Sequence, residues 1–412
     1  MNLLAIAWTS LRRHRASSAL AALALASGVA LLLAVAALRQ QAHERFTQAG
    51  LGVDAVLGPK GSPLQIVLNA VYHLDDMPGR VPWTTFQAVK THPAVADGFA
   101  LVTGHSYGGV RVNAVETRFL SEFHWKPATP FALAAGRLPT GVREAVAGAE
   151  AAARLGIAPG FRFCPVCGVN PGDPVHDRDE ITVTGVLAPT GTPHDRVIYL
   201  RLEDFYTLGG HGSDTAAMAD DPAHREISGA YLVLTRIRGG SFHPGIQDLQ
   251  YQLRQSPKAQ LVLPAETMPR LFSVIGWVDR VLEAVAALVA VLGAAFLTLA
   301  LLATLRERRR DLALLRALGA GRRTVGGLVL LQALVISIAG TLLGLVLAHG
   351  LLWYGCAVLT QETGLVFTPW CWSTTHTLVL ALAPLLGLGA GLVPAIQAYR
   401  LPLLSTLSPH TS

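Results

Sequence analysis

The side chains of this sequence best suited to chemistry are two cysteines separated by two residues, Cys164 and Cys167. Two thiolates at this spacing can share a zinc ion, and His176 follows as a third ligand. A closed tetrahedral site also needs a fourth ligand, which here must be a nearby carboxylate such as Asp177 or Asp179. In an oxidising compartment the two thiols can instead form a disulfide, or they can remain unpaired. The spacing leaves all three interpretations open.

Two further groups have residue types found in binding sites. Cys356 and Cys371 flank a short connection, and they can form a second disulfide or lie as buried thiols. Ten of the fourteen histidines fall within residues 39–276, which keeps a metal-linked role open. A loose divalent site is conceivable within 209–225, although a solvated loop is the simpler interpretation. Its residues are His211, Asp214, Asp220, Asp221 and His224.

Common catalytic signatures are missing from the sequence. None of the four lysines follows a glycine, so there is no phosphate-binding loop of the G-x-x-x-x-G-K-[ST] type. There is no H-E-x-x-H, and the run Thr103–Gly108 lacks the G-x-S-x-G order of a nucleophile elbow. We therefore expect no catalytic residues and no cofactor bound directly by this chain, apart from the zinc considered above.

An arginine-rich segment lies between two long apolar stretches. Seven arginines fall between Arg306 and Arg323, against two acidic residues. Such a short cationic loop is retained on the cytoplasmic side of a membrane. Leu312, Leu315 and Gly319 follow helical spacing, which predicts a short amphipathic helix and a docking surface for a partner. A plain cytoplasmic loop without a partner is the alternative.

The elements that position these residues belong to a membrane protein. Apolar residues make up 51% of the chain, charged residues make up 15%, and the mean hydropathy is +0.42. A helix that crosses a bilayer needs about 20 mainly apolar residues. Four segments meet this requirement: 16–38, 277–305, 324–348 and 377–398. Small residues in the last two segments favour close helix packing: Gly326, Gly327, Gly340, Gly344, Gly387, Gly389 and Gly391.

The cations also orient the chain. Arg12, Arg13 and Arg15 precede the first span, Arg400 follows the last, and residues 349–376 contain no Lys or Arg. Residues 1–15, 306–323 and 399–412 are therefore predicted to be a cytoplasmic lead-in, loop and tail, with 39–276 and 349–376 outside. A cleaved signal peptide is the alternative for the first span, but its apolar stretch is longer than usual for such a peptide. The spans hold almost no ionisable groups, which argues against an ion path, and four helices per chain favour a dimer.

Residues 39–276 are expected to form a large α+β domain inserted between the first two membrane helices. Strands are predicted at Gly109–Val115, Glu180–Leu187, Val197–Leu200 and Ala230–Ile237. Helical patterns occur at Thr84–Lys90 and Glu144–Leu155, and Gly209–Arg225 is predicted to be a loop.

Three segments resemble the MacB/FtsX/LolC-type ABC transporter permeases. Arg306–Val325 is similar to the R-x-R-E-I-x-x-L-R-A-L-G-A signature of that family, with Asp311 in place of the usual Glu. Ala7–Arg15 resembles its amphipathic lead-in, and Pro394–Pro402 resembles its closing P-A-x-x-A-x-x-x-x-P. Within 39–276, the stretches Arg143–Gly160, Ile181–Leu187 and Asp195–Leu200 look like the end of its periplasmic core domain. The segment Cys164–Asp179 and the loop Gly209–Arg225 are departures from the family pattern.

This resemblance implies a multi-pass permease of the bacterial inner membrane, with both termini in the cytoplasm. It implies a non-enzymatic subunit that pairs with a second permease copy and with a separate P-loop ATPase, which would bind ATP and Mg²⁺. A periplasmic or lipoprotein partner is a further expectation, whereas nucleic acid is not. The substrate expected for export or extraction is hydrophobic, lipid-like or peptide-like, and mechanical transmission to a periplasmic partner is a close variant. A zinc-linked component and a membrane-anchored ligand sensor or scaffold without an ATPase are the alternatives.

By the same resemblance, the cytoplasmic segment between the second and third spans would couple the permease to the ATPase. The residues implied in this coupling are Arg306, Glu307, Arg308, Arg309, Arg310, Asp311, Leu312, Leu314, Leu315, Arg316, Leu318 and Gly319.

Overall fold

The computed structural model describes residues 9, 12, 15–48, 52–168, 173–174, 177–208, 225–317, 319–363 and 366–400. The chain forms two compact units. The helical unit comprises Met1–Ala42, Ile275–Val358 and Phe367–Ser412, and the sheet unit comprises His43–Val274 and Leu359–Val366.

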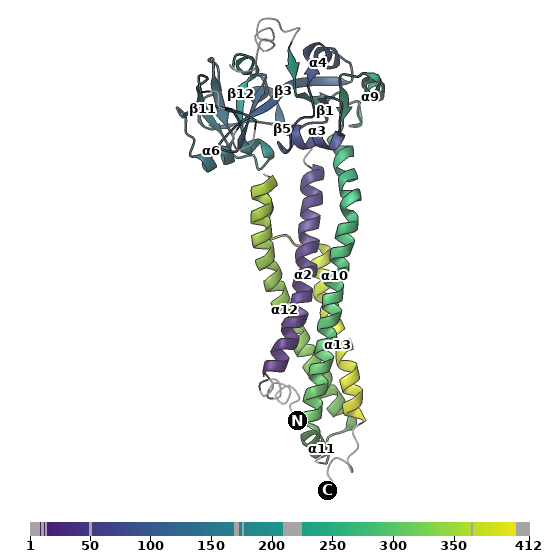
Figure 1. Ribbon diagram of the computed structural model, residues 1–412. Coiled ribbons are helices and arrows are strands. Elements are labelled where there is room, and N and C mark those ends of the chain that lie inside the picture. The colour runs from purple at the N-terminus through teal and green to yellow at the C-terminus, as the bar shows by residue number, and fades with distance from the viewer. Residues whose placement is uncertain are drawn as a thin grey trace. The chain divides into compact units, whose positions relative to one another are not determined.

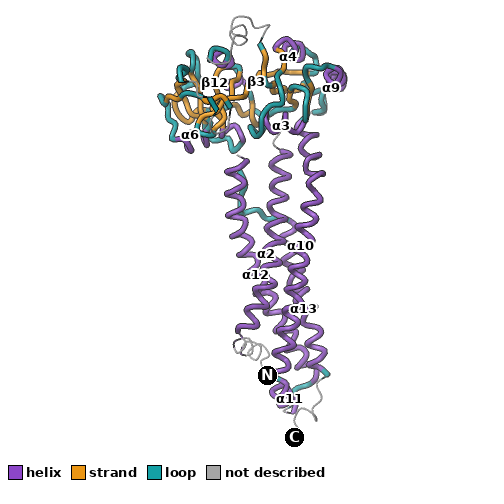
Figure 2. Tube along the Cα trace, in the orientation of Figure 1, coloured by secondary structure: helices purple, strands orange, loops and turns teal. Residues whose placement is uncertain are grey.

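The helical unit is built from long apolar helices (Figures 1 and 2). Within the described residues, four helices are long and apolar enough to cross a membrane. They are α2 (Arg15–Gln48), α10 (Pro264–Glu307), α12 (Arg322–Thr363) and α13 (Thr374–Tyr399). Each contains one of the predicted spans, so the predicted four-helix membrane class is confirmed. The short helix α11 (Arg309–Ala317) lies between α10 and α12 in the chain.

Glycines bring the backbones of two neighbouring helices against α2. A Cβ atom added at Gly293 of α10 would lie 2.8 Å from the carbonyl oxygen of Ala24, and one added at Gly344 of α12 would lie 2.8 Å from that of Ala26. Any side chain at these two positions would therefore push the helices apart. Close approach of this kind compensates for the weak hydrophobic drive between helices in lipid.

The predicted glycine contacts are only partly present on α12 and α13. A Cβ atom at Gly391 would meet the Ala333 side chain at 2.5 Å, so this glycine is needed where the two helices cross. At Gly327 and Gly389, by contrast, an added Cβ atom would have no neighbouring atom within 4 Å. These two glycines make no close helix contact within the described part of this chain, so close packing at these positions stays a prediction.

The sheet unit contains a mixed eleven-stranded sheet with the strand order β15-β1-β14-β3-β4-β12-β8-β11-β7, while β10 pairs with β3 and β9 with β11. Two pairs, β12 with β4 and β11 with β8, are parallel. The strands are β1 (Ala55–Gly58), β3 (Val95–Tyr107), β4 (Val110–Val115), β7 (Leu133–Gly136), β8 (Glu144–Ala147), β9 (Arg162–Phe163), β10 (Val166–Cys167), β11 (Ile181–Leu187), β12 (Val197–Arg201), β14 (Gly229–Leu234) and β15 (Gln260–Val262).

Short helices and two small ribbons complete the sheet unit (Figure 1). The ribbons pair β2 (Val81–Pro82) with β13 (Glu226–Ile227) and β5 (His124–Lys126) with β6 (Thr129–Pro130). The helices are α3 (Pro63–Ala70), α4 (Trp83–Lys90), α5 (Phe119–Glu122), α6 (Ala149–Leu155), the 3-10 helix η1 (Pro193–Arg196), α7 (Leu202–Phe205) and α9 (Gly245–Gln255). The predicted α+β class is therefore confirmed.

The main local error of the sequence prediction is at residues 144–147. This Ala-rich stretch was expected to begin a helix, yet Glu144–Ala147 is strand β8, and the helix begins only at Ala149. β8 pairs with β12 on one side and β11 on the other, so sheet pairing overrides the local helix propensity. Gly148 separates the two elements, because a Cβ atom there would lie 2.5 Å from the carbonyl oxygens of His194 and Asp195.

Candidate functional site

The predicted amphipathic helix is present as α11, and it ends in a tight backbone turn. The Ala320 N–H donates to the Leu315 carbonyl (3.0 Å), and the Gly319 N–H donates to the Arg316 carbonyl (3.1 Å). Gly319 has φ +99°, a left-handed conformation that glycine adopts without strain. This is a Schellman cap, so the glycine fixes where the chain leaves the helix.

One face of α11 is anchored in the helical unit. Leu312 is 5% exposed and packs in a cluster with Leu305, Val325 and Leu328, with Leu315 at the edge of the cluster. Burying a leucine side chain contributes about 2 kcal/mol. The prediction that Leu312 contacts a partner is therefore corrected, because its side chain is consumed in positioning the helix.

The opposite face of α11 is exposed and carries mixed charge. Leu314 is 53% exposed, and Arg309 and Asp311 of the same helix are exposed as well. Asp311 lies in the first turn and Arg316 in the last, which suits the helix dipole. Arg308 Nε lies 4.0 Å from Asp311 Oδ2.

Exposed cations also flank α11 in the chain. Arg306 and Glu307 are exposed at the end of α10, and Arg322 and Arg323 are exposed at the start of α12. We define the α11 surface as Leu314 together with the exposed charged residues Arg306, Glu307, Arg309, Asp311, Arg322 and Arg323. Leu318 and the side chain of Arg310 lie outside the described part of the structure.

A large cavity lies in the sheet unit. Its volume is about 1000 Å³, at the upper end of the range for ligand pockets. The lining combines aromatic carbon from Phe99, Trp125 and Phe242 with charged groups. Among these, Asp97 is held by two Arg118 hydrogen bonds of 2.8 and 2.9 Å.

A buried polar network lies elsewhere in the sheet unit, between residues far apart in sequence. His194 Nδ1 lies 2.5 Å from Tyr199 Oη and 3.5 Å from His73 Nε2, and Asn113 Nδ2 lies 3.2 Å from His73 Nδ1. Burial lowers the pKa of His194 to about 3. Burial, reinforced by His194 and Arg111, lowers the pKa of His73 well below its ordinary value. Both imidazoles are therefore neutral near pH 7.

The cysteines differ from the disulfide prediction, because Cys164, Cys167 and Cys356 are free thiols in the structure, so neither predicted disulfide is formed there. Cys167 lies in β10, paired with His105.

The metal predictions fall largely on undescribed residues. His176, His211, Asp214, Asp220, Asp221 and His224 lie outside the described part of the chain. Among the residues that are described, no group of three or more His, Cys, Asp or Glu side chains is arranged to hold a metal ion. The zinc site at Cys164, Cys167 and His176 therefore stays a prediction.

Comparisons with known proteins identify both parts of the chain. The model of the MacB-like periplasmic core domain matches residues 18–230, and that of the FtsX-like permease C-terminal region matches residues 283–403. No curated protein matches the sequence significantly. Among solved structures, the periplasmic region of MacB from Actinobacillus actinomycetemcomitans is similar, with 9% identity and a TM-score of 0.35. That match covers 55% of this chain and 97% of the MacB region.

Proposed function

The chain belongs to the FtsX-like permeases with a MacB-like periplasmic core domain, and we propose that it couples a separate cytoplasmic ATPase to movement of that domain. As a permease component of an ABC-type system, it needs a source of ATP hydrolysis. The sequence has no phosphate-binding loop of its own. In this proposal the ATPase is a partner chain, with ATP and Mg²⁺ bound there.

The observation that carries this proposal is the α11 surface. Leu314 is an exposed apolar side chain on a helix whose other face is anchored by Leu312. A protruding leucine on a fixed helix fits a pocket on a partner, and the surrounding arginines favour a pocket with an acidic rim. A rigid mounting also lets a displacement of the partner move the helix as a body.

Movement would pass from α11 to the periplasmic domain along α10. This helix runs from Pro264 to Glu307, and its residues belong to both units of the chain. The proposed orientation places α11 and both termini in the cytoplasm and the sheet unit in the periplasm, with the helices in the inner membrane. A second permease copy completes the complex.

The proposed substrate is hydrophobic, lipid-like or peptide-like, and it is exported or extracted from the membrane. The cavity of about 1000 Å³ supports this class, since it offers aromatic surface and charges of both signs. Its volume suits a peptide segment or part of an acyl chain. A periplasmic or lipoprotein partner would receive the substrate or the movement.

The test is purification of the tagged chain from its native membranes in mild detergent, followed by identification of co-eluting proteins. We expect a stoichiometric P-loop ATPase with the wild-type chain. Leu314→Asp should lose most of that ATPase, because it places a carboxylate where an apolar contact is expected.

Val142→Asp is the matched control, since Val142 is 71% exposed in the sheet unit and far in sequence from α11. This control should keep the ATPase. Absence of any ATPase after cross-linking would overturn the proposal and favour a membrane-anchored sensor. Full retention by Leu314→Asp would overturn the role of the α11 surface.

A further inference from the structure

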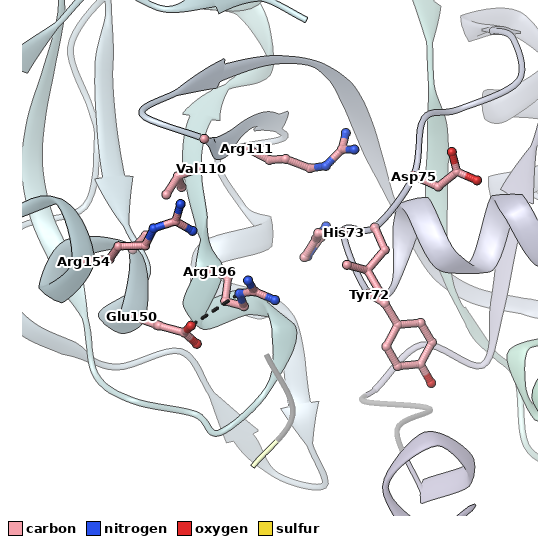
Figure 3. A pocket seen from close by; sticks show the side chains of 11 residues that line it. Tyr72, His73, Asp75, Val110, Arg111, Glu150, Arg154 and Arg196 are labelled. Carbon is pink, nitrogen blue, oxygen red and sulfur yellow. Dashed lines mark ion pairs between the residues drawn. The ribbon is translucent and has the colours of Figure 1, made fainter. Parts of the chain in front are cut away.

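A second, smaller cavity in the sheet unit is lined by three arginines (Figure 3). Its volume is about 280 Å³. Arg111 belongs to β4, Arg154 to α6 and Arg196 to η1, and the segment Tyr72–Asp75 after α3 closes the other side. The cavity is too small for an acyl chain of ordinary length but large enough for a compact anion.

The three guanidinium groups differ in how far they are already neutralised. Arg196 Nε lies 3.4 Å from Glu150 Oε1. Arg111 Nη1 lies 3.1 Å from Asp76 Oδ1, but the Asp76 side chain is 67% exposed, so water screens that pair. Arg154 is exposed, and it makes no ion pair with any other residue that the structure describes.

Two carboxylates, Asp75 and Glu150, also line the cavity. Glu150 pairs with Arg196. Burial raises the pKa of its carboxyl group, while the charges of Arg196 and, more weakly, Arg154 lower that pKa. The positive charge left for a ligand therefore comes from Arg154 and, in part, from Arg111.

The backbone at the cavity wall is strained. His73 and Asp75 have φ +55° and +62°, a left-handed conformation that costs a non-glycine residue roughly 1 kcal/mol. The turn is closed by a hydrogen bond from the Leu74 N–H to the Leu68 carbonyl (2.8 Å). The His73 ring is 7% exposed and lies against Asn113 and His194. Strain of this kind is concentrated at ligand sites, where the surrounding structure maintains it.

The chemistry of the lining selects the class of anion. A guanidinium group binds two oxygens of an oxyanion at once, in the plane of its fork. A carboxylate has two oxygens and is satisfied by one such fork, whereas a phosphate group can face several cations. Since cations from three separate elements line one small cavity, a phosphate group fits better.

We propose that this cavity binds a phosphate group, with Arg154 and Arg111 as its main ligands and Arg196 in support. The phosphate comes from free inorganic phosphate or from a phospholipid headgroup placed at the cavity mouth. The inference is independent of the α11 surface, because binding needs neither ATP nor an ATPase.

The test is isothermal titration of inorganic phosphate into the full-length chain, purified in a neutral detergent and a phosphate-free buffer. We expect saturable binding with one site per chain. Arg154→Gln should weaken it at least tenfold, and Arg154→Lys should give an intermediate loss because it keeps the charge but not the fork. Since Arg154 is exposed, neither change should disturb folding. Arg238→Gln, an exposed arginine in the turn after β14, should bind phosphate as the wild type does.

A competition with dihexanoyl-phosphatidylglycerol, kept below its micelle-forming concentration, distinguishes the two sources. Competition that is lost in Arg154→Gln supports a lipid headgroup, and phosphate binding without competition supports the free ion. No saturable phosphate binding, or equal affinity in the wild type and Arg154→Gln, would overturn the proposal.

Discussion

Replacing His194 by Gln should remove part of the pH dependence of the stability of the sheet unit. The folded-state pKa of His194 is about 3, whereas an unfolded histidine titrates near 6.5. Between these values the unfolded chain binds the proton and the folded chain does not. The free energy of unfolding therefore falls as the pH falls below about 6.5.

The size of this effect follows from the two pKa values. From pH 7.5 to pH 5, His194 alone should lower the free energy of unfolding by about 2 kcal/mol, which is roughly a 30-fold change in the unfolding equilibrium. His73 acts in the same direction, since its pKa is also lowered, chiefly by burial. Glu150 and Asp204 oppose it, because burial raises their pKa values and their protons favour the folded state.

Hydrogen exchange of the full-length chain in detergent provides the assay. The amides of β12, Val197–Arg201, lie in the core of the sheet, and their protection, corrected for the intrinsic pH dependence of exchange, reports the free energy of opening. The loss of protection between pH 7.5 and pH 5 should be about 30-fold smaller in His194→Gln than in the wild type. Contributions from Glu150 and Asp204 are common to both proteins and largely cancel in this comparison. His73 contacts His194, so its own pKa shifts with the substitution, and His194→Gln reports the coupled pair.

His124→Gln is the matched control, since His124 is exposed in the same unit; it should behave as the wild type does. Equal losses of protection in the wild type and His194→Gln would refute the reasoning, because they would mean that His194 is protonated as easily in the folded state as in the unfolded state.

Two further predictions concern packing and an ion-pair cluster. Gly344→Val should destabilise the helical unit by about 1–3 kcal/mol, because its side chain would collide with Ala26 and Val29. Gly350→Val should have little effect, since nothing lies within 4 Å of an added Cβ there. After heating in detergent, Gly344→Val should lose its monodispersity at a lower temperature than the wild type, and Gly350→Val should not. Arg118→Gln should cost about 1–2 kcal/mol, because Arg118 binds both oxygens of Asp97 and lies 4.2 Å from the Phe99 ring centroid. Arg162→Gln is the control, because Arg162 and its partner Glu180 have side chains that are 65% and 55% exposed. It should change the free energy of unfolding of the sheet unit, measured by hydrogen exchange, by no more than about 0.5 kcal/mol.

Local sequence patterns predicted the elements with strong periodicity. The membrane helices follow from uninterrupted apolar runs, and β11 and β12 follow from β-branched residues between turn signals. The leucine spacing likewise predicted the amphipathic helix α11. These features depend on neighbouring residues, which a sequence displays directly.

The features that the sequence did not predict depend on distant residues. β8 is a strand only because β11 and β12 lie beside it. Arg111, Arg154 and Arg196 belong to three separate elements and have no common spacing, so the phosphate cavity was missed. The burial of Leu312 was missed for the same reason, because its neighbours Val325 and Leu328 follow in the next helix.

The close backbone contacts around α2 have a mechanical consequence. Interlocked side chains resist the sliding of one helix along another, because each must leave its hole before the next one can be entered. Beside Gly293 and Gly344, where the helices approach most closely, side chains of this kind are present: Ala21 shares a cluster with Leu297, and Leu33 shares one with Ala348. A displacement of α10 or α12 along its axis is therefore passed to α2 instead of being lost as slippage between the helices.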